Sequence, residues 1–201
     1  MTMKICFKFI QACSNSLFTG LVSTLITLLL SFIAAWCLER IDIKFKGLLS
    51  IIFIIPMLIP SISHAFGLVA LFGKSGFITK ILNININIYG ILGIIVGSIM
   101  YAFPVSFLMF SNILHYEDGN QYKAAEVLGI PRIRAFINIT LPYLKKTTIS
   151  AFFAVFTMVV TDYGVPLMIG GKTITLSTFM YNKAVGLQVT NYKPSLSTTG
   201  V

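Results

Sequence analysis

The chain has 201 residues, of which 56% are hydrophobic and only 10% are charged. Because a soluble domain carries roughly 25% charged residues, this composition excludes a protein that covers its whole surface in water, and it indicates a membrane protein. The net charge of +9 does not indicate a nucleic-acid-binding protein, since the basic residues are scattered between apolar runs and build no basic face. Basic loops beside membrane spans account for the charge.

Four apolar runs reach the length of about 20 residues that a helix needs to cross a bilayer. A signal peptide is the alternative for the first run, but that run is too long for one and lacks a small-residue cleavage site. We therefore expect an all-α polytopic helix bundle preceded by an N-terminal tail over 1–16. The four predicted spans cover about 17–38, 48–72, 90–114 and 147–169.

Prolines interrupt three of these runs. Pro56 and Pro60 lie in the second run, Pro104 lies in the third, and Gly164 and Pro166 break the end of the fourth. Membrane helices tolerate prolines when neighbouring helices satisfy the freed carbonyl groups. Four spans, three of them with such kinks, predict a bundle with a path through it.

The basic residues between the runs predict the orientation, because cytoplasmic loops are enriched in Lys and Arg. The loops after the first and third runs hold most of them, and the loop over 73–89 holds two. We expect the first and third loops to lie in the cytoplasm. The basic residues are Arg40, Lys44 and Lys46 in the first loop, Lys74 and Lys80 in the second, and Lys123, Arg132, Arg134, Lys145 and Lys146 in the third.

The third loop, over 115–146, has the pattern of two short helices joined by a turn. Gly129 ends the first helix, because glycine adopts the left-handed conformation that closes a helix. Pro131 suits the first turn of a second helix over 132–139. This second helix is predicted to stop before Leu141-Pro142, since a residue that precedes proline leaves the α region. A solvated loop is the alternative.

This loop resembles the EAA loop of permease subunits of binding-protein-dependent ABC importers, the type I or MetI-like family. The family loop reads E-A-A, three residues, G, nine residues and I-x-L-P, and Lys123 replaces its first glutamate. The resemblance implies that the loop docks into a cleft on an ATP-hydrolysing subunit, with any salt bridge of that glutamate absent. The implied coupling residues are Lys123, Ala124, Ala125, Glu126, Gly129, Ile139, Leu141 and Pro142.

The resemblance covers almost the whole chain. Asn15-Ser16-Leu17 is similar to the start of the permease core, and the segments 56–61 and 161–167 are most similar to permeases for iron(III) and 2-aminoethylphosphonate. Such permeases often contain two fused cores of five spans. The present chain is expected to be a truncated first core, with an extracytoplasmic tail over 171–201 in place of the fifth span.

The family also implies the partners and the location. These are an ABC ATPase subunit, a second permease core, an extracytoplasmic substrate-binding protein and the lipid of the bacterial cytoplasmic membrane. No cofactor and no nucleic acid are expected. The expected function is a share of the translocation path of an ATP-driven importer. A stand-alone membrane channel and an inactive truncated permease are the alternatives.

Asp162 is the only acidic residue placed inside a predicted span. A charge in lipid is costly, so such carboxylates usually face a bundle interior or a wet path. One hypothesis is that Thr161, Asp162 and Tyr163 line the outer part of the translocation path. The other is that Asp162 caps a short helix that begins at the Gly164-Val165-Pro166 break.

No catalytic or metal-binding set is predicted. Gly170-Gly171-Lys172-Thr173 imitates the end of a phosphate-binding loop, but Pro166 stands where that loop needs its first glycine. His64 and His115 have no Cys, His or carboxylate at ligand spacing. We therefore expect any ATP hydrolysis to reside in a partner.

Overall fold

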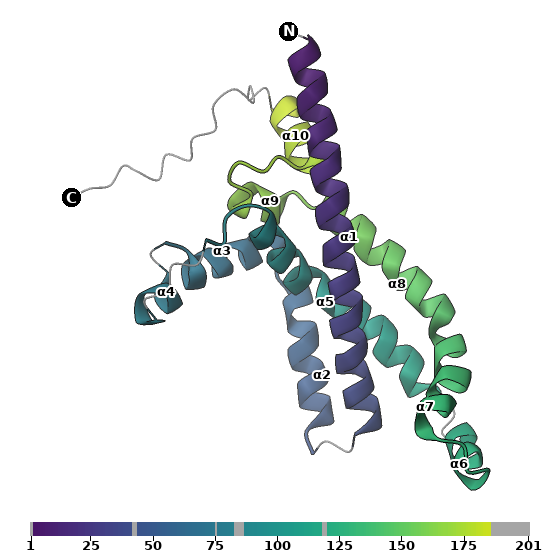
Figure 1. The fold of residues 1–201 in the computed structure, drawn as a ribbon. Helices are drawn as coiled ribbons and strands as arrows, with labels where there is room; N and C mark the ends of the chain where they lie inside the picture. Colours follow the sequence, from purple (N-terminus) through teal and green to yellow (C-terminus); the bar gives the residue numbers. More distant parts are fainter. Residues whose placement is uncertain (1, 42–43, 75, 83–86, 118–119, 186–201) are drawn as a thin grey trace. The chain divides into compact units, whose positions relative to one another are not determined.

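The computed structural model describes residues 2–41, 44–74, 76–82, 87–117 and 120–185, and these residues form helices, turns and no strand. The helical order is drawn in Figure 1. The chain divides into two compact units, which are described separately here. The first unit comprises Met1–Ser23, Pro60–Ser98 and Met158–Val201, and the second comprises Thr24–Ile59 and Ile99–Thr157.

Helix α1 runs from Thr2 to Arg40. The predicted N-terminal tail over 1–16 is therefore wrong for the described residues, because they already belong to this helix. The physical reason lies in the composition of 2–16, which contains neither glycine nor proline to interrupt the backbone hydrogen bonds.

The second predicted span, 48–72, is not one kinked helix. Helix α2 covers Lys46–Ile54 and continues as the 3-10 turn η1 over Ile55–Leu58, with Pro56 in its first turn. Ile59 then adopts an extended conformation (φ −103°, ψ 131°), and α3 begins anew at Ser61 and ends at Phe72. Pro60 excludes the residue before it from the α region, so the helix breaks here instead of bending.

The remaining elements follow the expected order with shifted ends. Helix α5 contains Pro104 without interruption. The fourth predicted span, 147–169, begins earlier and is split, and the predicted tail contains α10, whose first turn is closed by a capping box at Thr175. Residues 186–201 of that tail lie outside the described part. The bounds are α4 Phe77–Leu82, α5 Ile91–His115, α6 Asn120–Val127, α7 Arg132–Ala135, η2 Phe136–Thr140, α8 Leu141–Thr161, α9 Gly164–Ile169 and α10 Leu176–Ala184.

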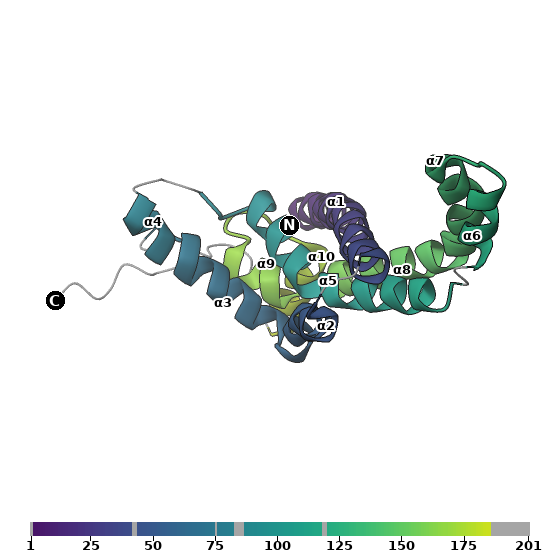
Figure 2. The ribbon, with the colours of Figure 1, turned by 90° about the horizontal axis from the view of Figure 1, so that it is seen from below.

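Each unit has its own buried apolar cluster. In the first unit α3 packs against α9, and the two helices lie side by side in Figure 2. Ala65 and Leu68 of α3 meet Val165 and Ile169 of α9 there. In the second unit the C-terminal half of α1, α2, α5 and α8 share a larger cluster, whose buried members are Leu28, Ala35, Leu38, Phe107, Phe110, Leu114, Leu144 and Ala151.

Four stretches of the described residues are long and apolar enough to cross a membrane, and this confirms the predicted number of spans. Two of them, Ile91–His115 and Ile133–Thr161, overlap the third and fourth predictions. The helical stretch Lys46–Leu58 is apolar but shorter. The other two stretches are Ile5–Arg40 and Ser61–Ile81.

Candidate functional site

The predicted coupling loop forms a bent pair of short helices, α6 and α7, which we call the elbow (residues 120–135; Figure 1). Helix α6 ends in a Schellman motif. The Ile130 N–H donates to the Ala125 carbonyl at 2.9 Å, and the Gly129 N–H donates to the Glu126 carbonyl at 3.0 Å. Gly129 has φ +69°, the left-handed conformation that this motif requires. The predicted role of Gly129 as the end of the first helix is confirmed.

The second arm of the elbow differs from its prediction. The Pro131 carbonyl accepts the first bonds of α7, from Arg134 and Ala135. Helix α7 then widens into the π turn η2 and runs without interruption into α8, and Leu141 lies in the α region (φ −62°, ψ −44°). The predicted stop before Pro142 is wrong, because the wider π turn that ends at Thr140 leaves room for the ring of Pro142 inside a continuous helix.

Three large apolar side chains of the elbow are exposed. Val127, Leu128 and Ile133 are 88%, 74% and 77% exposed. Ala125 on the first arm and Ala135 on the second are buried. Groups of exposed apolar side chains are a common feature of surfaces that bind other proteins.

The predicted coupling residues are thus distributed over the elbow, η2 and the start of α8. Ala125 is buried and Ile139 is half-buried. Lys123 lies in α6, and its side chain is outside the described part of the chain. The exposed members are Ala124, Glu126, Gly129, Leu141 and Pro142.

A buried carboxylate holds the elbow to the end of α1. One oxygen of Glu117 pairs with the guanidinium of Arg40, and the other accepts a hydrogen bond from the Thr140 hydroxyl at 2.7 Å. Thr140 also shares a hydrogen bond with the Tyr122 hydroxyl. The Glu117 side chain is only 3% exposed. We call Arg40, Glu117, Tyr122 and Thr140 the Glu117 network.

Aromatic rings surround the cation of this network. The Arg40 guanidinium carbon lies 5.2 Å from the ring centre of Trp36 and 4.8 Å from that of Tyr122. These distances are within the range of cation–π attraction. Trp36 in turn contacts Phe136 of the π turn edge to face, with ring centres 5.0 Å apart.

Sequence reasoning missed this network. Arg40 was interpreted only as a charge that sets orientation, and Glu117 was not singled out. The available signal was an acidic residue directly after the third apolar run and a basic residue directly after the first. Their pairing joins residues 77 positions apart, which no local pattern reveals.

Glu39, at the end of α1, is a second carboxylate that contacts other helices of the same unit, α2 and α5. Glu39 accepts hydrogen bonds from the Lys46 ammonium at 2.6 Å and from the Ser111 hydroxyl at 3.0 Å. His115 Nδ1 lies 3.4 Å from the same carboxylate. The cluster therefore joins the ends of α1 and α5 to the start of α2.

Asp162 lies in the first unit, at the break between α8 and α9. Its carboxylate accepts hydrogen bonds from the backbone N–H groups of Gly164 and Val165, at 3.3 and 3.1 Å. These are the bonds of the capping hypothesis. The Ser61 hydroxyl donates to the same carboxylate at 2.6 Å, so the break is also attached to the first residue of α3. Thr161 and Tyr163 on either side are exposed.

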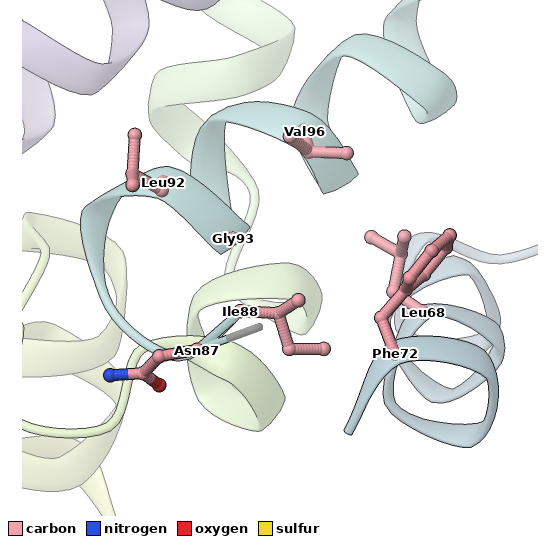
Figure 3. A pocket seen from close by; sticks show the side chains of 7 residues that line it. All are labelled: Leu68, Phe72, Asn87, Ile88, Leu92, Gly93 and Val96. Carbon is pink, nitrogen blue, oxygen red and sulfur yellow. The ribbon is translucent and has the colours of Figure 1, made fainter. Parts of the chain in front are cut away.

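One apolar cavity of about 260 Å³ lies in the first unit (Figure 3). Leu68 and Phe72 of α3 face Ile88, Leu92 and Val96 across it. Among the described residues that line it, Asn87 is the one polar residue. A lining of this kind offers no chemistry beyond apolar contact.

Comparison with known proteins supports one family. The protein named as ferric transport system permease FbpB 1 of Haemophilus influenzae is 27% identical over 190 residues, which are 90% of this chain. FbpB of Actinobacillus pleuropneumoniae gives the same identity and coverage. The PotC homolog of Mycoplasma genitalium, named as a spermidine/putrescine permease, is 26% identical over 87% of the chain. The chain spans only 29%, 27% and 59% of these three relatives.

The family match itself covers residues 27–196. This range includes the elbow, all four residues of the I-x-L-P motif that follows it (139–142), and the whole Glu117 network, from Arg40 to Thr140. The chain therefore belongs to the family of binding-protein-dependent transport system inner membrane components, the permease family that its loop resembles.

Proposed function

We propose that this chain forms part of the translocation path of an ATP-driven importer in the bacterial cytoplasmic membrane. The observation that carries the proposal is the elbow, in which the left-handed Gly129 exposes Val127 and Leu128 at the tip of a polar segment. A tip of this kind in a chain of the permease family is suited to dock into a soluble subunit. Cargo transport by the named relatives supports the same function.

The proposed partners follow from this role. They are an ATPase subunit at the elbow, a second permease core, an external binding protein and membrane lipid. The family is one of transport subunits, and we propose that ATP hydrolysis resides in the partner. Ferric ion is the first cargo to assay, because two ferric permeases align with 90% of the chain.

We further propose a path at the break between α8 and α9. Thr161 and Tyr163 are exposed there, and Asp162 shapes the break through its bonds to Gly164 and Val165. Movement of the elbow would shift the opening of the path between the two faces of the membrane.

The proposal is tested by replacing Gly129 with valine in the complete transporter. A Cβ atom at this position meets no atom within 4 Å, so the change is expected to act mainly through the backbone conformation. A β-branched residue in the left-handed conformation costs about 1–2 kcal/mol, and the elbow should lose its bend. We expect the ATPase to stop co-purifying and the uptake of ferric ion to fall, while the chain still inserts.

The matched control is Gly129→Asn, because asparagine tolerates the left-handed conformation. This variant should retain both the ATPase and uptake. Retention of both by Gly129→Val would contradict docking through the elbow. Conductance in a planar bilayer without ATP would favour the stand-alone channel.

A further inference from the structure

The elbow has two covalent neighbours, α5 before it and α8 after it, and the chain offers no direct connection from it to α1. Arg40 nevertheless contacts Glu117, which is 77 residues away, and lies over the ring of Tyr122 in α6. Both residues belong to the second unit, as does α1 from Thr24 onwards. The end of α1 therefore touches the elbow through side chains alone.

The carboxylate of Glu117 is the centre of this contact. One oxygen pairs with Arg40 of α1, and the other accepts the hydroxyl of Thr140 at the end of the π turn. Thr140 then bonds Tyr122 of α6. The carboxylate of Glu117 thus links η2 directly, and α6 through Thr140 and Tyr122, to the end of α1.

Burial makes the link hard to replace. The Glu117 side chain is 3% exposed and Thr140 is fully buried, so water does not readily substitute for either partner. A buried carboxylate without its cation is strongly unfavourable. The Trp36–Phe136 contact adds an apolar connection between α1 and the π turn.

We infer that Glu117 is a positioning residue that makes the cytoplasmic end of α1 move as one body with the elbow. This inference rests on the proposed function, in which an ATPase moves the elbow. A push on the elbow then reaches α1 through the Glu117 network, in addition to α5 and α8 through the backbone.

The test measures the distance between spin labels on α1 and α6 in the complete transporter. Ile41→Cys and Gln121→Cys carry the labels, because both positions are exposed, and Cys6, Cys13 and Cys37 are replaced by alanine. We expect one narrow distance distribution in the parent, which stays unchanged on adding ATP. Glu117→Gln should broaden it, because the amide removes the charge that holds Arg40.

Two further variants keep the test decisive if Glu117→Gln folds poorly. Arg40→Lys keeps the charge but loses the planar group that lies over two rings. Thr140→Val keeps the shape and loses the hydroxyl. Both should broaden the distribution and lower the uptake per ATP hydrolysed by about tenfold, a typical size for coupling between two sites. Lys145→Gln, an exposed charge change on α8, should do neither.

The outcomes separate the two proposals. A distribution that stays narrow in Glu117→Gln, or a parent distance that changes with ATP, overturns the link. Broadening in the three variants while the ATPase still co-purifies supports it. If the three variants broaden the distance distribution but the ATPase does not co-purify even with the parent protein, the link is supported and the proposed function is overturned.

Discussion

At the scale of single residues, the break between α8 and α9 depends on the absence of a side chain at Gly164. A methyl group there would lie 2.5 Å from the Ser61 hydroxyl oxygen and 3.0 Å from the Ile62 backbone nitrogen. The same hydroxyl donates to Asp162. Ser61 at the start of α3 thus takes part both in the close approach of α3 to Gly164 and in the hydrogen bonding of the capping carboxylate, Asp162.

Gly164→Ala is expected to destabilise the protein. The added methyl group must displace the start of α3, and overpacking of this kind costs about 1–3 kcal/mol. Thermal unfolding of the detergent-solubilised protein measures the effect. Gly67→Ala is the matched control, since a methyl group on Gly67 in α3 meets nothing within 4 Å. That control should be neutral or gain up to about 1 kcal/mol, and equal melting of the two variants would contradict the close packing at Gly164.

Among the helices and turns, the elbow separates residues that hold its shape from residues that face outwards. Ala125 and Ala135 are buried, whereas Val127 and Ile133 are more than three-quarters exposed. Substitutions on the outer side should therefore affect a partner and leave the fold of the chain intact.

Val127→Asp tests this separation. Val127 is 88% exposed, so the isolated chain should lose only the roughly 0.3–1 kcal/mol that a negative charge costs at the C-terminal end of a helix. The charge should nevertheless prevent the ATPase from co-purifying, because it would be buried without a partner in the docked state. Gln121→Asp places the same charge elsewhere on α6 and serves as the control. Retention of the ATPase by Val127→Asp would remove this side from the docking surface.

The elements also show which features local sequence patterns can predict. The position of Gly129 at the end of α6 was predictable, because a glycine after a short helical pattern commonly ends the helix. A disturbance of the helix at Pro60 was predictable, since proline restricts the backbone conformation of the residue before it. The continuous helix through Pro142 was not, because a π turn has no composition of its own. The Glu117 network was not, because it depends on three helices meeting in space.

At the scale of the whole molecule, the exposed apolar surface and the distribution of charge determine where the chain can reside. At most half of each candidate membrane stretch is buried within the chain. The remaining apolar surface is available to lipid or to other helices. Eight of the 15 basic residues lie in the first and third loops.

Labelling with a membrane-impermeant maleimide tests the predicted orientation. In a cysteine-free background, a cysteine at Asn87 should react in intact cells, because the second loop is predicted to lie outside. A cysteine at Gln121 should react only after the membrane is opened. Both positions are exposed. Reaction of the Gln121 position in intact cells would place the elbow on the wrong side for an ATPase and overturn the proposed function.

The interruption at Ile59 and Pro60 also limits what can surround this part of the chain. Its extended residue and its proline interrupt the regular ladder of backbone bonds between η1 and α3. Hydrocarbon cannot solvate the carbonyl groups left there. If this break lies within the bilayer, lipid acyl chains cannot be the groups that contact these carbonyls. Either another helix or water molecules must then occupy the space beside them.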